Sequence, residues 1–169
     1  MNVQALALKL PEITQWIDKT LADYSSQAKI VSELRFPRLP QFYSENLLAN
    51  AKVVPVTKVP VPPLSQLGLT EFVAFEAGNY NGITYKDTYF VQEDLMTNEA
   101  LHFHELVHVV QWMHLGVDRF LLTYAVGLAR YGYRDSPLEM VAYSLQEYFQ
   151  LGGEPKNVEA IIRSEADRL

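Results

Sequence analysis

The first apolar side chains that recur at helical spacing are Ile13, Trp16, Ile17, Leu21 and Tyr24. They predict a helix over residues 11–28, with Pro11 in its first turn, where the missing N–H of a proline costs no hydrogen bond. A second, short helix is predicted over 40–51. Beyond residue 97 the same periodicity, with glycines and capping residues at the boundaries, predicts four more helices over 98–115, 118–132, 136–152 and 155–169.

Two segments between these groups of helices, 70–76 and 83–91, have the β-branched and aromatic content of strands. Residues 78–82 between them are rich in glycine and asparagine, so a hairpin is predicted. The proline-rich stretch over 53–63 is expected to be extended. This order predicts one α+β, zincin-like domain over 1–169, in which a small antiparallel or mixed sheet packs with an active-site helix and further C-terminal helices. Residues 1–65 form its N-terminal helical and proline-rich segment, and 66–169 its catalytic part.

Composition narrows the classes of protein and partner. With 169 residues, 49% of them hydrophobic, the chain can bury a sizeable core. A formal net charge of −6 and the lack of a basic stripe argue against nucleic acid or a membrane as a partner. We expect a cytoplasmic location, because the N-terminus lacks a signal-peptide pattern and no apolar run approaches the roughly 20 residues of a transmembrane helix. There is no cysteine, so any metal must be held by histidine and carboxylate ligands.

Residues 104–108 read H-E-L-V-H, an H-E-x-x-H motif inside the predicted helix over 98–115. Side chains four residues apart on a helix lie on one face, about 6 Å apart along the axis, so His104 and His108 can bind one Zn²⁺ from the same side. Glu105 flanks that face and can act on a water molecule as a general base. A catalytic zinc site has three protein ligands and one open position, so a third ligand is needed.

His114 is one candidate for the third ligand. It stands at the spacing of the last histidine in H-E-x-x-H-x-x-G-x-x-H, but Gln111 occupies the position of the glycine. That glycine allows the helix to break, whereas glutamine favours its continuation. On a continuous helix His114 lies about 100° from the metal-binding face. We therefore expect His114 to be a core or interface residue, and we expect His102, on another face, not to be a ligand.

Glu139 is the other candidate. It begins a separate predicted helix and would complete a His₂Glu site. The same residue also fits a capping box, Ser136-x-x-Glu139, in which the carboxylate folds back on its own helix terminus. The residues alone give these two roles equal weight, with Glu147 as a more distant alternative ligand.

The stretch H-E-L-V-H-V-V-Q-W resembles the H-E-L-T-H-V-V-Q-Q helix of bacterial zincin-like domains associated with extracellular contractile injection systems. In those domains a glycine-containing strand precedes the helix, and residues 82–90 occupy its place here. The chain also resembles bacterial proteins in which H-E-L-V-H is followed by a proline-leucine-glutamate helix, an architecture similar to gluzincins. The resemblance covers residues 78–150. It implies His104, His108 and Glu139 as zinc ligands and Glu105 as the base.

Further roles are assigned to side chains near the motif. A hydrolytic zinc site needs a group that stabilises the oxyanion, and Tyr143, one turn beyond Glu139, is the expected one. Its alternatives are Tyr124, Tyr131 and Tyr133. A carboxylate commonly orients a ligand imidazole through its second nitrogen, and Asp87 and Asp135 are the candidates.

The strand over 83–91 comes directly before the motif helix and is expected to lie at the cleft, where it can pair with an extended peptide or protein substrate. The other interpretation is an ordinary edge strand protected by Lys86 and Asp87. Residues 1–65 either complete the hydrophobic core or act as a pro-segment that lies along this strand.

These features predict a zinc-dependent hydrolase, a metallopeptidase that cleaves peptide bonds with a water molecule activated by Zn²⁺ and Glu105. The alternative is a catalytically inert binding or scaffold module with a zincin fold, in which the metal is structural or absent. Glu105 argues against this alternative, because a purely structural site does not need that carboxylate.

Overall fold

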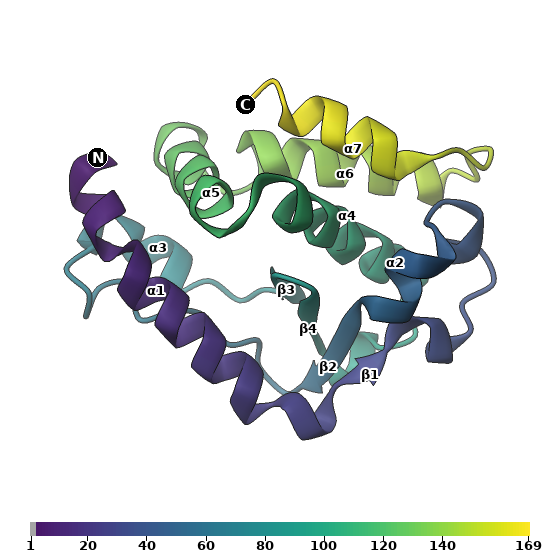
Figure 1. Ribbon diagram of the computed structural model, residues 1–169, viewed down its shortest axis with the longest axis horizontal. Coiled ribbons are helices and arrows are strands. Elements are labelled where there is room, and N and C mark those ends of the chain that lie inside the picture. The colour runs from purple at the N-terminus through teal and green to yellow at the C-terminus, as the bar shows by residue number, and fades with distance from the viewer. Residues whose placement is uncertain (1–2) are drawn as a thin grey trace.

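The computed structural model describes residues 3–169, which form seven α-helices and one four-stranded sheet (Figure 1). The helices are α1 (Val3–Asp23), α2 (Glu45–Asn50), α3 (Val73–Glu76), α4 (Glu99–Leu115), α5 (Val117–Tyr131), α6 (Pro137–Gln150) and α7 (Val158–Ala166). The strands are β1 (Lys29–Ile30), β2 (Lys52–Val56), β3 (Gly82–Tyr85) and β4 (Thr88–Gln92). The expected α+β class is confirmed.

The sheet is mixed, and its strand order is β1-β2-β4-β3. β2 and β4 run parallel in the centre, while β1 and β3 pair antiparallel with them at the two edges. Helix α4 packs on β3 and β4. The strand nearest to the motif is therefore at an edge of the sheet.

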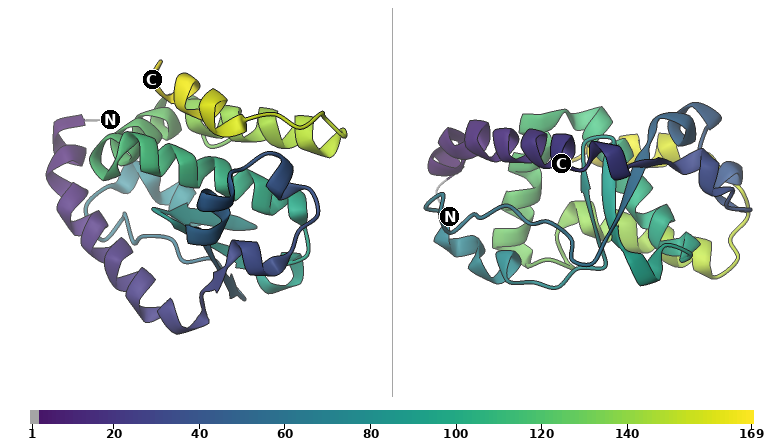
Figure 2. Two further views of the ribbon diagram at one scale, coloured as in Figure 1. Left: turned by 45° about the vertical axis from the view of Figure 1, so that its right-hand side comes forward. Right: turned by 90° about the horizontal axis from the view of Figure 1, so that it is seen from below.

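The two faces of the sheet are covered by different helices, because side chains alternate along each strand. Val53 of β2 joins Phe103 of α4 in one hydrophobic cluster. Its neighbour Val54 joins Ile17 of α1 in a second cluster. Beyond α4, helices α6 and α7 form an outer layer, and α1 runs along the opposite side of the molecule (Figures 1 and 2).

Helix α1 differs from the prediction at its beginning, because it extends from Val3 and carries Pro11 in its interior. A proline there removes one backbone hydrogen bond, so the sequence favoured a helix that starts at the proline. The structure shows a buried apolar stripe on both sides of Pro11, formed by Leu6, Leu10, Ile13 and Ile17. Burial of these side chains outweighs the lost hydrogen bond.

The prediction of a strand over 70–76 is wrong. Residues Thr70–Phe72 form a 3-10 turn that leads directly into α3. In a helical conformation Phe72 and Phe75 lie on one side, whereas a strand would place them on opposite faces. Both phenylalanines line the same cavity, so packing decides for the helix.

The hairpin of the structure, formed by β3 and β4, lies almost entirely within the strand predicted over 83–91. The chain reverses at Lys86 and Asp87, and Lys86 has a φ of 59°. Glycine or asparagine usually supplies this left-handed conformation, so the turn chemistry of the sequence pointed to 78–82 instead. Lys86 and Asp87 therefore form the turn and do not protect an edge.

The described part of residues 1–65 belongs to the core. Val31, Leu39 and Leu47 are buried in the same cluster as the motif helix. The extended stretch provides β2, which lies on the far side of β4 from β3. β2 therefore does not cover the free edge of β3, as a pro-segment would.

The helices α4 to α7 lie where the sequence predicts them, with differences of a few residues at their ends. α4 ends at Gly116, whose φ of 74° is a conformation that glycine adopts without strain. α5 begins directly after this glycine, and not behind a cap at Asp118. Within the described residues, no helix combines the length and the apolar character needed to cross a membrane.

Candidate metal centre

Helix α4 positions the motif in the interior of the molecule. Asn98 caps its beginning by accepting a hydrogen bond from the N–H of Leu101. The helix then passes between the sheet and helices α6 and α7, so almost all of its side chains are buried. Polar residues in such a position need polar partners from neighbouring elements.

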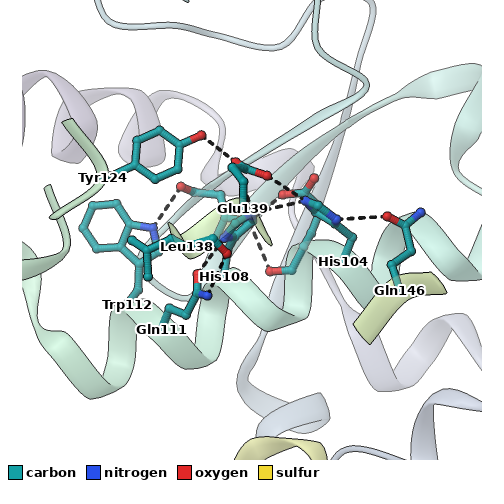
Figure 3. A network of polar contacts seen from close by, with 10 residues as sticks. His104, His108, Gln111, Trp112, Tyr124, Leu138, Glu139 and Gln146 are labelled. Atoms are coloured by element: carbon teal, nitrogen blue, oxygen red, sulfur yellow. Dashed lines mark hydrogen bonds and ion pairs between the residues drawn. The ribbon is translucent and has the colours of Figure 1, made fainter. Parts of the chain in front are cut away.

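His104 and His108 lie one turn apart on α4, and both imidazoles point toward Glu139 in the first turn of α6 (Figure 3). Their Nε2 atoms are 3.1 Å apart. His104 Nε2 lies 3.3 Å from Glu139 Oε2, and His108 Nε2 lies 3.4 Å from Glu139 Oε1. The three buried residues could therefore bind a metal ion together.

Hydrogen bonds on the far side of each ring decide which nitrogens face Glu139. His104 Nδ1 lies 3.0 Å from Gln146 Oε1, and His108 Nδ1 lies 2.8 Å from Gln111 Oε1. An amide oxygen only accepts, so each Nδ1 carries the hydrogen and each Nε2 of the neutral rings offers a lone pair. Two lone pairs and a carboxylate thus converge on one point, an arrangement that a cation stabilises.

The donor atoms lie close enough together to share one small ion. The two histidine nitrogens are 3.1 Å apart, and each lies within 3.4 Å of one oxygen of the Glu139 carboxylate. Among the described residues, Glu139 Oε2 is one of two buried side-chain polar atoms without a hydrogen-bond partner. The residues present therefore fit a divalent ion.

Glu139 does not form the capping box that its sequence context also allowed. Ser136 is the N-cap residue of α6 but makes no side-chain capping bond, and its Oγ is the other unpartnered atom. Tyr124 of α5 instead donates a hydrogen bond to Glu139 Oε1 at 2.6 Å. The capping interpretation is wrong, because the carboxylate points to α4 and α5 and not to its own helix terminus.

The charges of the three residues depend on one another. Burial alone would raise the pKa of Glu139, but the imidazoles of His108 and His104 lower this pKa well below its usual range. Burial alone would lower the pKa of His108, but the Glu139 carboxylate outweighs it and raises the pKa to about 9. The carboxylate therefore stays ionised, which is the form that binds a metal, and a bound metal replaces the proton that His108 carries at neutral pH.

Gln111 and Gln146 orient the imidazoles of His108 and His104, so the expectation that Asp87 or Asp135 does so is wrong. Asp87 pairs with Lys52, and Asp135 is exposed. Neutral amides were missed because a carboxylate is the commoner partner of a ligand imidazole.

The sequence did contain a signal for Gln111, which lies three residues after His108 and therefore on the same side of a helix. Its Nε2 also donates to the Leu138 carbonyl at 3.0 Å (Figure 3). One amide thus connects a histidine of α4 with the residue that precedes Glu139, and it fixes the position of α6 relative to α4.

Glu105 lies beside the three residues and is held from one side. Thr84 of β3 donates a hydrogen bond to its Oε2 at 2.7 Å. Burial raises the pKa of Glu105 above its usual value. A Cβ atom at Gly82 would collide with Glu105 Oε1, so the glycine makes room for this oxygen at the edge of β3.

Tyr143 follows Glu139 by one turn on α6, and its ring centroid is 4.6 Å from that of His104. Burial raises the pKa of its hydroxyl, which therefore remains a hydrogen-bond donor at neutral pH. Tyr124 already donates to Glu139, and Tyr133 contacts Tyr80. Tyr143 lies against the ring of His104, whereas the ring centroid of Tyr124 is farther from that of His108, at 6.4 Å.

Four further candidates lie away from the three residues. His114 is partly exposed, and its Nε2 lies 2.7 Å from a carboxylate oxygen of Asp167. His102 lies on another face of α4 and forms hydrogen bonds with the Tyr89 hydroxyl and the Met96 carbonyl. Glu147 and Tyr131 are exposed.

Comparisons with known proteins found no match: no protein-family model, no curated protein and no solved structure matches the chain. The interpretation of the site therefore rests on its own geometry.

Proposed function

We propose that this protein is a zinc-dependent hydrolase of gluzincin type that cleaves peptide or other amide bonds. The observation that carries the proposal is the convergence of His104, His108 and Glu139 on one point, with the carboxylate of Glu105 beside it. The donor set is the His₂Glu set of catalytic zinc sites. A structural site would have no use for Glu105 or for a cavity that reaches the ligands.

Bound zinc supplies a Lewis acid, which lowers the pKa of water toward about 7 and polarises a carbonyl group. Glu105 takes the proton of the attacking water on Oε1, because Oε2 already accepts from Thr84. The water oxygen bonds to the carbonyl carbon, and Glu105 returns the proton to the leaving amine as the C–N bond breaks.

The free edge of β3 is suited to hold an extended substrate. Gln92 N donates to Asn81 O, so the ladder alternation directs the backbone groups of Gly82 and Thr84 away from β4. The Thr84 carbonyl already accepts a hydrogen bond from the indole of Trp112. The backbone groups of Gly82 lie next to Glu105. A peptide that pairs with this edge places its backbone beside the base.

Tyr143 is the proposed oxyanion donor. It is half-buried, stays protonated and touches the ring of a metal ligand. Its hydroxyl supports the negative oxygen that forms when water adds to the carbonyl.

The test is the metal content of protein purified without chelator or nickel resin, combined with turnover of a quenched-fluorescent peptide library. We expect about one zinc per chain, as a three-ligand site binds one ion. Glu105→Gln should keep this zinc and lose more than the roughly 10²–10⁴-fold of ordinary acid–base catalysis, because glutamine cannot accept the water proton.

The alternative scaffold function predicts a different result. Protein without zinc, or turnover that survives Glu105→Gln, would refute the proposed mechanism. Zinc-loaded protein that neither turns over the library nor binds acetohydroxamic acid, a small zinc chelator, would favour the scaffold.

A further inference from the structure

An apolar cavity opens directly onto the proposed metal centre. Glu105, His108 and Glu139 form one end of it. The remaining walls come mainly from α1, from the segment over 62–75, from β3 and from α5. Of these, α1 and the segment over 62–75 lie in the N-terminal part of the chain, far from the motif in sequence. The cavity is therefore shared between the catalytic residues and the N-terminal part of the chain.

The lining of the cavity extends over several turns of two helices. On α1 it is lined by a stripe that runs from Leu6 to Ile17, which spans about 16 Å of helix at 1.5 Å per residue. On α5 the lining runs from Phe120 to Leu128, about 12 Å. A single aromatic side chain would fill only part of such a space.

Beyond the metal centre, the walls offer no charge to a ligand. Among the described residues that line the cavity, the carboxylates are Glu105 and Glu139, and there is no lysine, arginine or aspartate. A charged side chain or a terminal carboxylate would lose its hydration there without compensation.

The hydroxyl groups of the walls are already used within the protein. Tyr85 donates to the Pro60 carbonyl at 2.8 Å, and Tyr80 donates to the Phe75 carbonyl at 2.9 Å. Away from the edge of β3, a peptide backbone that entered the cavity would leave its own N–H and C=O groups unpaired. A polymethylene chain has no such groups, so it suits these walls better than a peptide.

The cavity wall and a metal ligand are parts of one rigid unit. The rings of Trp112 and Phe120 stack at 4.0 Å, and Phe120 stacks on Tyr124 at 5.7 Å. Tyr124 donates to Glu139 at the end of this stack. A chain that packs against the aromatic wall is therefore held in register with the metal centre.

We propose that the cavity binds the acyl chain of an N-acylated peptide or amino acid, whose amide bond is the one hydrolysed. This inference rests on the proposed hydrolase function and names its substrate class. The acyl carbonyl lies at the metal centre, the chain lies along α1, and the peptide follows the edge of β3. Water adds to the acyl carbon, the C–N bond breaks, and the products are a fatty acid and a free amine.

The test uses alkyl hydroxamic acids of two to ten carbons, whose common head chelates zinc while the chain enters the cavity. Calorimetry on zinc-loaded protein should show an affinity that rises about fourfold per methylene group to at least eight carbons. A plateau at or before four carbons, or stronger binding of 3-phenylpropanohydroxamic acid than of the eight-carbon compound, would overturn the proposal in favour of a short aromatic pocket.

Variants of the walls make the test specific. Leu10→Trp on α1 and Leu128→Trp on α5 should flatten the chain-length series and leave the affinity for acetohydroxamic acid unchanged. Leu8→Trp is the matched control, because Leu8 lies on the same helix but is 79% exposed. If neither wall variant changes the series while both remain folded by circular dichroism, the chain does not occupy the cavity.

A second readout separates this inference from the proposed function. Zinc-free protein should bind the neutral dye N-phenyl-1-naphthylamine, and decan-1-ol should displace it. Dye displacement without any zinc binding would refute the hydrolase but keep the chain site. Zinc and acetohydroxamate binding without dye displacement would keep the hydrolase and refute the chain site.

Discussion

Helix α4 carries two buried polar networks, which differ in whether both nitrogens of each histidine have a hydrogen-bond partner. His102 accepts a hydrogen bond from the Tyr89 hydroxyl at 2.7 Å on Nδ1 and donates to the Met96 carbonyl at 3.0 Å from Nε2. Both of its nitrogens are satisfied, and burial lowers its pKa to about 4. His104 and His108 are each satisfied on Nδ1 only, and their Nε2 atoms face one carboxylate.

The difference separates a structural histidine from a candidate metal ligand. A buried network that is complete within the protein rigidifies the core and needs nothing further. A network with converging lone pairs and an unpartnered carboxylate oxygen has one position left for a cation. Burial alone does not distinguish the two, since all three histidines are buried.

Removal of one member from each network gives the largest expected effects. Glu139→Ala should lower zinc affinity more than the roughly 10–100-fold that loss of an outer partner costs, because one of three ligands is gone. His102→Ala should keep zinc but lower the free energy of unfolding by about 2–4 kcal/mol, because it leaves a cavity and unpaired polar groups. Elemental analysis and urea unfolding measure the two effects. Equal zinc loss in both variants would contradict the distinction between the structural His102 and the proposed metal site.

Removal of a supporting amide should have an intermediate effect. Gln111→Ala takes away the acceptor of His108 Nδ1, so zinc affinity should fall about 10–100-fold. Chelator competition measures this affinity. Asp87→Ala is the control and should leave it unchanged, because Asp87 contacts Lys52 and not a histidine. An effect of Asp87→Ala as large as that of Gln111→Ala would remove Gln111 from its supporting role.

Glu159 can be compared with Glu139, because both of its carboxylate oxygens accept hydrogen bonds within the protein. It accepts from Ser44 N and from Arg163, both at 2.8 Å. Burial opposes ionisation, but these bonds outweigh it and lower the pKa of Glu159. Its contribution to stability is therefore present above the unfolded-state pKa of about 4.3 and is lost as pH falls through the lower folded-state value.

Glu159→Gln should therefore lower the free energy of unfolding by about 1–2 kcal/mol at pH 7, without loss of zinc. The difference in the free energy of unfolding between the variant and the wild type should become smaller as pH falls below about 4. Urea unfolding of the zinc-free proteins across this pH range measures it. A difference that grows on acidification would mean that Glu159 is not stabilised as an anion.

The smallest effect is expected for His114→Ala. The pair between His114 and Asp167 is partly exposed, so its loss should cost no more than about 1 kcal/mol. Zinc content should be unchanged, since His114 lies away from the cluster. Loss of zinc in this variant, together with its retention in Glu139→Ala, would replace the glutamate by the histidine as third ligand.

The helices α4 to α7 were predictable from local signals. Gly116 and Ser136 mark helix boundaries through backbone geometry that depends on few neighbours. The sheet was less predictable, because the turn at Lys86 uses a residue that rarely adopts its conformation. Phe72 and Phe75 form a helical turn only because the cavity wall lies beside them.

The sequence by itself determined the local geometry of the motif, because the spacing of His104 and His108 on one helix fixes the side on which both imidazoles lie. It left Glu139 between two roles that are equally compatible with its neighbours. The tertiary structure excluded the capping role, since the packing of α6 on α4 and the hydrogen bond from Tyr124 turn the carboxylate toward His104 and His108. Such contacts join residues far apart in the chain, and no local spacing encodes them.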